Sequence, residues 1–137
     1  MDRKPKPSYH IEPMPRKQFL SLMKSFKSSG GIYLANDESE IYLEAKGAEA
    51  VTLNAKTILF RKRPSRSAVY EELFHVEQYR EGKIDGSLCN KYICEIEAKK
   101  YLLENAENFQ LTEAEITQTK ISLKWYETKL KELEREG

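Results

Sequence analysis

The segment VYEELFHVEQ, residues 69–78, indicates one amphipathic helix with its polar residues gathered on one side. Each residue of an α-helix turns by about 100°, so Glu71 and His75 lie one turn apart on the same face. Glu72 lies within reach of both. The adjoining arc is apolar and consists of Val69, Leu73 and Val76. The three polar side chains are therefore expected at the margin of a surface that faces the core.

The spacing of Glu71, Glu72 and His75 is typical of a metal site carried by a helix. Ligands at positions i and i+4 can hold one cation and leave a position for water, and a carboxylate at i+1 can take the water's proton. Glu71 and His75 are thus candidate ligands, and Glu72 is a candidate general base. The alternative for a lone helical histidine is a hydrogen-bonded boundary residue. Gln78 is either a hydrogen-bond partner of one of these ligands or an ordinary exposed glutamine.

The helix expected over residues 90–108 offers a third ligand. Glu97 lies inside its apolar arc, and Glu95 lies on the edge of that arc. A carboxylate in a buried arc is costly unless it is protonated, paired or bound to a cation. Glu97 is therefore a candidate ligand, and its alternative is an ion pair with a neighbouring lysine. Glu104 is the reserve ligand.

Elsewhere the pattern predicts a small sheet and two further helices. Apolar residues recur at helical spacing over residues 16–27, and Gly30 with Gly31 ends that helix. The short β-branched and aromatic runs that follow predict strands over residues 32–34, 41–43, 51–53 and 57–60. Turn residues between these runs favour consecutive antiparallel strands.

The C-terminal part of the chain is helical by its apolar spacing, beginning near Ser67 and interrupted by Gly82 and Gly86. Thr112, with Glu115 three residues later, predicts a capping box at the start of the last helix. The fold class that results is α+β, a small antiparallel sheet with an N-terminal helix and three C-terminal helices.

The proline content, charge and cysteine count limit the classes of protein that fit this sequence. Residues 1–15 contain four prolines among lysines and arginines and are expected to form an arm or linker, while residues 16–137 fit a single domain. The 23 Lys and Arg residues nearly balance the 22 Asp and Glu residues, so neither nucleic acid nor a membrane is expected as a partner. Cys89 and Cys94 are too few for a structural zinc site, and Cys94 is expected to be buried.

Residues 69–78 resemble the Glu-Glu-x-x-His-x-x-Gln variant of the zincin helix found in zincin-like metallopeptidase toxin domains of bacterial polymorphic toxin systems. Residues 95–98, Glu-Ile-Glu-Ala, resemble the second-helix segment in which such zincins place a glutamate ligand. The resemblance covers roughly residues 30–133, and its specific part is these two segments. It departs from ordinary zincins at Glu71, where a first histidine usually stands.

The resemblance implies a zincin-like metallopeptidase domain that hydrolyses peptide bonds, with Glu71, His75 and Glu97 as ligands and Glu72 as general base. Zinc is the implied metal, and one histidine with carboxylates is a harder ligand set that admits manganese, iron or cobalt. A protein or peptide substrate and an immunity protein are the implied partners. The module is expected in the cytoplasm when free, or exported within a larger toxin to act in the cytoplasm of a target cell.

Two other classes of protein compete with this interpretation. A carboxylate-bridged di-metal bundle would use Glu72 with His75, but it needs a second Glu-x-x-His pair, which the sequence lacks. A non-catalytic zincin-like binding or immunity module would keep the shell of the site without activity. Convergence of Glu71, His75 and Glu97 on one point separates the enzyme from both.

Overall fold

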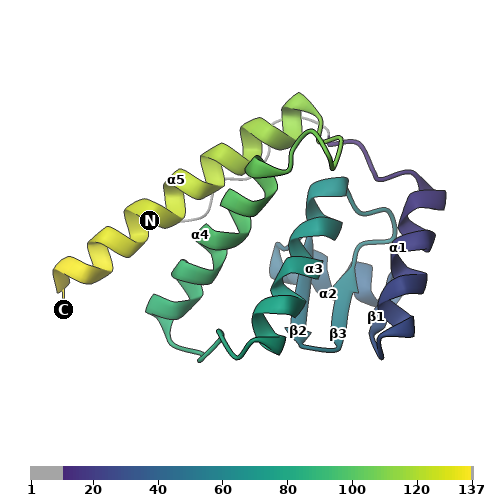
Figure 1. The fold of residues 1–137 in the computed structure, drawn as a ribbon, viewed down its shortest axis with the longest axis horizontal. Helices are drawn as coiled ribbons and strands as arrows, with labels where there is room; N and C mark the ends of the chain where they lie inside the picture. Colours follow the sequence, from purple (N-terminus) through teal and green to yellow (C-terminus); the bar gives the residue numbers. More distant parts are fainter. Residues whose placement is uncertain (1–10, 137) are drawn as a thin grey trace. The chain divides into compact units, whose positions relative to one another are not determined.

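The computed structural model describes residues 11–136, and its contacts divide the chain into two compact units. One unit is Glu12–Glu81, and the other contains Gly82–Gly137. In chain order the first unit contains α1 (Arg16–Ser28), β1 (Ile32–Leu34), α2 (Asp37–Lys46), β2 (Ala50–Asn54), β3 (Thr57–Phe60) and α3 (Arg66–Arg80), and the second contains α4 (Leu88–Glu104) and α5 (Glu113–Glu136) (Figure 1). The α+β class is therefore confirmed. The single domain over residues 16–137 stays a prediction, and residues 1–10 of the expected arm lie outside the described part.

The sheet of the first unit has three strands in the order β1-β3-β2. β1 (Ile32–Leu34) pairs in parallel with β3 (Thr57–Phe60), whereas β2 (Ala50–Asn54) pairs with β3 in antiparallel fashion. The expectation of a purely antiparallel sheet is therefore wrong. The reason is the helix inserted between β1 and β2. It lets the chain reverse, so that β2 runs opposite to β1, and β3 then returns alongside β1 in the same direction.

That inserted helix is α2 (Asp37–Lys46), where residues 41–43 were expected to form a strand. Asn36 and Ser39 form a reciprocal capping box, and Gly47 ends the helix in the left-handed conformation at φ 67°. These two caps outweigh the strand preference of three residues. Leu43 is fully buried while Ile41 is 69% exposed, so the segment presents one helical edge to the sheet.

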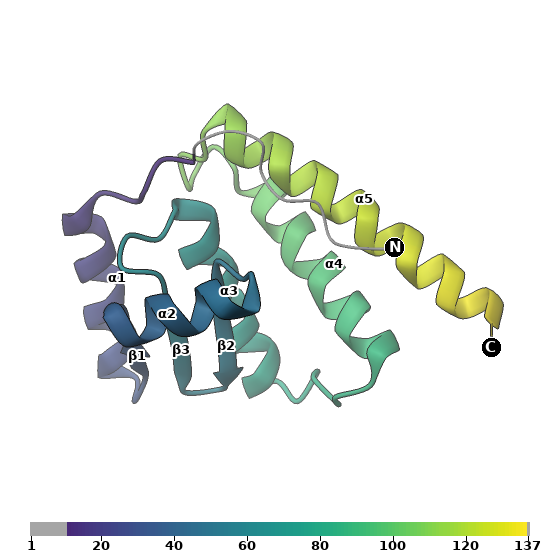
Figure 2. The same ribbon diagram turned by 180° about the vertical axis from the view of Figure 1, so that it is seen from behind.

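The core of the first unit lies between the sheet and two helices, α1 (Arg16–Ser28) and α3 (Arg66–Arg80). Its buried residues come from all three and from the segment before α1: Met14, Phe19, Met23, Phe26, Ile58, Phe60, Val69 and Val76. α2 covers the opposite face, as comparison of Figure 1 with the reverse view in Figure 2 shows. The expected first helix is confirmed, and Met14 is part of this core.

The second unit is built from α4 (Leu88–Glu104) packed against α5 (Glu113–Glu136). The predicted capping box is confirmed, because the Thr112 hydroxyl accepts from the Glu115 amide at 3.2 Å and a Glu115 carboxylate oxygen accepts from the Thr112 amide at 3.0 Å. Cys94 is buried as expected, and both cysteines are free. Within the described range, no helix combines the length and hydrophobicity that a membrane crossing requires.

Candidate metal centre

α3 forms where the sequence predicts it and carries the candidate ligands of the first unit. The Ser65 side chain caps its N-terminus by accepting from the Ala68 amide at 3.1 Å. Val69 and Val76 anchor the helix in the core, which fixes its rotation about its axis. That rotation leaves Glu72 only 6% exposed and His75 only 8% exposed. The expected position at the margin of the core is therefore confirmed for these two residues.

Glu71, Glu72 and His75 form a cluster in which one potential ligand atom of each lies within 4.8 Å of the others. The Glu71 Oε2 and the His75 Nε2 are 3.7 Å apart. This separation exceeds the length of a hydrogen bond, about 2.9 Å. It is close to the distance of about 3.4 Å between two ligands that bind one tetrahedral cation at about 2.1 Å. Two carboxylates and an imidazole at these distances form a donor set that suits a divalent cation.

Gln78 contacts the opposite side of the His75 ring. The His75 Nδ1 and the Gln78 Oε1 are 2.6 Å apart, and Gln78 is only 1% exposed. An amide oxygen only accepts hydrogen bonds, so Nδ1 carries the proton in this arrangement. In a neutral ring the lone pair then lies on Nε2, the nitrogen that faces Glu71. Gln78 is thus a buried partner of the histidine and not an exposed glutamine.

Glu72 contacts β2 through a residue that the sequence did not single out. The Thr52 hydroxyl lies 2.9 Å from the Glu72 Oε1 and 3.0 Å from the Glu72 carbonyl oxygen. Thr52 is 20 positions upstream of Glu72, and only strand-to-helix packing brings the two together. A threonine between the apolar residues Val51 and Leu53 was the available sequence signal.

The second unit contains the other candidate ligands, all on α4. Glu97 is half-buried, and Glu104 is exposed. Glu95 pairs with Lys99, whose Nζ lies 3.1 Å from the Glu95 Oε1 and is itself buried. Glu97 as the third ligand stays a prediction, as does the zincin-like character of the fold.

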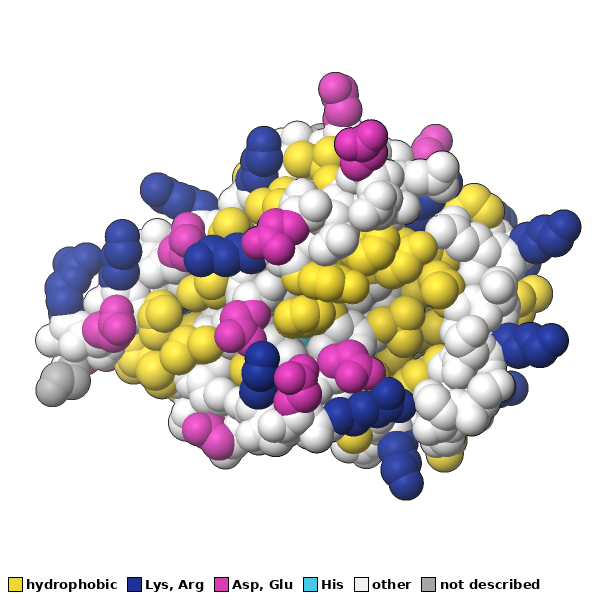
Figure 3. All heavy atoms as spheres, viewed as in Figure 1, with side chains coloured by type: hydrophobic (Ala, Val, Ile, Leu, Met, Phe, Trp, Pro, Cys, Tyr) yellow, Lys and Arg dark blue, Asp and Glu magenta, His cyan; other side chains and the backbone are white. Residues whose placement is uncertain are grey.

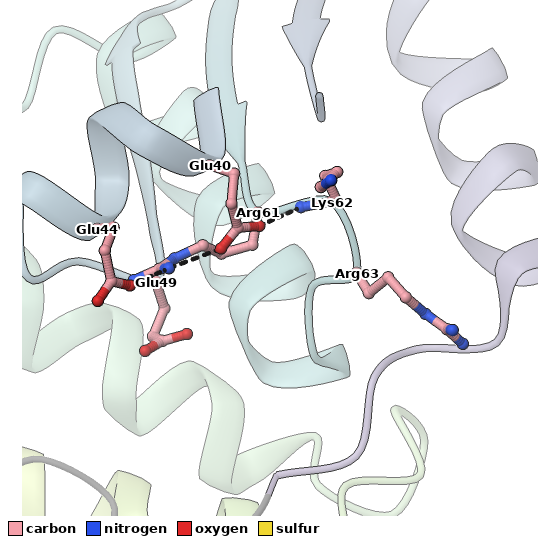
Figure 4. A pocket seen from close by; sticks show the side chains of 6 residues that line it. All are labelled: Glu40, Glu44, Glu49, Arg61, Lys62 and Arg63. Atoms are coloured by element: carbon pink, nitrogen blue, oxygen red, sulfur yellow. Dashed lines mark hydrogen bonds and ion pairs between the residues drawn. The ribbon is translucent and has the colours of Figure 1, made fainter. Parts of the chain in front are cut away.

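A separate hollow on the first unit collects charged side chains from α2 and from the end of β3 (Figure 4). Arg61 donates to Glu40 and to Glu44 at 2.7 Å each, and the Lys62 amide donates to Glu40 at 3.0 Å. These hydrogen bonds, that from Arg61 first, lower the pKa of Glu40. The lining is completed by Glu49 and Arg63. The basic run after β3 is therefore partly neutralised by α2.

Side chains of both charges are scattered over the face drawn in Figure 3, with hydrophobic side chains between them. This mixture agrees with the near balance of charge in the sequence.

Comparisons of the chain with protein-family models, curated proteins and solved structures find no match.

Proposed function

We propose that this chain is a metal-dependent peptidase in which Glu71, His75 and Glu97 hold a divalent cation and Glu72 is the general base. The observation that carries the proposal is the 3.7 Å separation of the Glu71 Oε2 and the His75 Nε2. Two ligands of one tetrahedral cation are separated by nearly this distance, about 3.4 Å. The side chains are also largely withdrawn from water, where two neighbouring carboxylates gain most from a cation.

When bound, such a cation supplies the Lewis acidity that makes water reactive at neutral pH. The Gln78 Oε1 accepts a hydrogen bond from the Nδ1–H of His75 and so keeps the Nε2 lone pair directed to the ligand side. Glu72 accepts a proton from the attacking water and then donates it to the leaving amine of the cleaved peptide bond. Its burial holds the carboxylate beside the ligands with little competition from solvent.

Zinc is the metal we propose, with manganese, iron or cobalt as the alternatives that a carboxylate-rich set admits. The resemblance of residues 69–78 and 95–98 to zincin-like toxin domains extends the proposal to a bacterial toxin effector. On that basis the substrate is a protein or peptide of the target cell, reached after export within a larger toxin. An immunity protein is the expected partner in the producing cell.

Metal titration tests the ligand set. Wild type is expected to bind one Zn²⁺, and Glu71→Gln, His75→Ala and Glu97→Gln are each expected to weaken the affinity by more than tenfold. Glu77→Gln is the matched control, because Glu77 is exposed on the same helix. Unchanged affinity in His75→Ala would overturn the metal site. A loss in Glu104→Gln but not in Glu97→Gln would move the third ligand to Glu104.

Casein cleavage by the zinc-loaded protein tests the reaction. Glu72→Gln is expected to lower the rate by about 100-fold or more while zinc stays bound, because a positioned general base contributes on that order. Equal cleavage by wild type and Glu72→Gln would exclude Glu72 as the base. Zinc binding by wild type without cleavage of any protein in a target-cell lysate would favour the non-catalytic binding module.

A further inference from the structure

β2 is the strand that lies next to the candidate metal centre. It is an edge strand that packs against α3, and Thr52 is paired with Ile58 of the neighbouring β3. The register shifts between Thr52 and Asn54, so the ladder is interrupted immediately after Thr52. Such irregularities twist a strand locally and re-aim its side chains. The strand thus changes course at the residue that contacts Glu72.

Thr52 differs from its surroundings because it is polar and only 8% exposed. Valine has nearly the same shape and would suit a side chain that only fills space. The hydroxyl instead lies 2.9 Å from the Glu72 Oε1, and the backbone carbonyl of Glu72 at 3.0 Å is its other acceptor. A hydrogen bond to a buried carboxylate is stronger than one between neutral groups.

We propose that Thr52 is a positioning residue for Glu72. Its hydroxyl holds Oε1, which fixes the direction in which the carboxylate faces Glu71 and His75. A base must be held within a fraction of an ångström of its working position, and a contact from a second element restricts the side-chain rotations that the helix leaves open. This inference rests on the proposed function.

The experiment compares Thr52→Val, which removes the hydroxyl and keeps the shape, with Thr52→Ser, which keeps the hydroxyl. Thr57→Val is the control, since it makes the same change on the adjacent strand, away from Glu72. The readouts are the dissociation constant for Co²⁺, the rate of casein cleavage and the urea midpoint of the metal-free protein. Thr52→Val is expected to slow casein cleavage by about tenfold, because a misplaced base loses rate, while Co²⁺ affinity stays within about threefold of wild type, because Glu72 is not a ligand. Thr52→Ser and Thr57→Val are expected to stay within about threefold of wild type on the same scale.

The Thr52→Val substitution in a Glu72→Met variant separates the effect of the Glu72 carboxylate from that of the Glu72 backbone carbonyl. In Glu72→Met the carbonyl remains and the carboxylate is gone, so Thr52→Val is expected to lower the urea midpoint by less than half as much as in wild type. An equal loss in both backgrounds would assign the hydroxyl to the carbonyl and overturn the proposal. Cleavage by Thr52→Ser as slow as by Thr52→Val, or no effect of Thr52→Val on cleavage, would also overturn it. If wild type binds no Co²⁺, the proposed function fails, and the midpoints alone decide whether Thr52 holds the carboxylate.

Discussion

Replacement of Gln78 by methionine isolates the contribution of its amide to the metal centre. Methionine is unbranched and of similar length, so it fills the same buried space without an acceptor for the His75 Nδ1 proton. The ring would then lose the 2.6 Å contact that favours the tautomer with its lone pair on Nε2. With the other tautomer, Nε2–H would point at Glu71 and compete with the cation.

The size of the effect follows from the burial of both partners. A buried N–H without an acceptor costs about 1–3 kcal/mol, which should appear in the unfolding free energy of the metal-free protein. Loss of a hydrogen bond that orients a ligand weakens metal binding by about 10- to 100-fold. That range corresponds to about 1.4–2.8 kcal/mol of binding free energy.

Zinc affinity measured by competition with a chromophoric chelator, together with urea unfolding, checks this prediction. Gln78→Glu retains an acceptor and is expected to bind zinc at least tenfold more tightly than Gln78→Met. Gln18→Met is the control, because Gln18 donates to the Tyr70 hydroxyl at 2.9 Å elsewhere in the same unit. Zinc affinity of Gln78→Met within threefold of the Gln18→Met value would refute the orienting role of Gln78.

Two further predictions concern the part of the fold around α2. Leu43→Ala should lower the free energy of unfolding by about 2–5 kcal/mol, while Ile41→Ala, at an exposed position, should change it by less than about 0.5 kcal/mol. Similar losses in urea unfolding would contradict the helix. The pKa of Glu40 is lowered in the folded state by its hydrogen bonds from Arg61 and the Lys62 amide. The ionised Glu40 therefore contributes fully to the free energy of unfolding above its ordinary pKa of 4.5, and this contribution disappears as the pH falls below that value. Glu40→Gln should cost about 0.5 kcal/mol at pH 7 after allowance for solvent screening, and nothing near pH 2; a constant difference across this range would disprove the link.

The helices of the fold were largely predictable because their signals are local. Spacing and capping residues place α1, α3 and α5 in the sequence, and the Thr112 capping box is formed as expected. α2 was missed although Asn36, Ser39 and Gly47 carry its caps. The three-residue run 41–43 has the β-branched and aromatic content of a strand, and the capping residues on either side of it are also typical of turns. The parallel pairing of β1 with β3 depends on that helix and was therefore missed with it.

The candidate site divides along the same line between local and long-range signals. Gln78 could be named beforehand because it lies three residues after His75, a spacing that helix geometry alone brings together. Thr52 could not be named, since its contact with Glu72 depends on how β2 packs against α3. Sequence spacing contains no information about that packing. Glu97 belongs to the same long-range category and stays a prediction.

Four side chains of the candidate centre come from two turns of α3: Glu71, Glu72, His75 and Gln78. The spacing of their backbones is consequently set by the pitch of one helix, and the sheet acts only on the Glu72 side chain, through Thr52. A mutation that loosens the sheet should leave Glu71, His75 and Gln78 in place as long as the helix survives, and should release only the Glu72 side chain. This helical segment could therefore be moved as one piece to another scaffold, where the threonine on β2 and Glu97, the proposed third ligand on α4, would have to be supplied again.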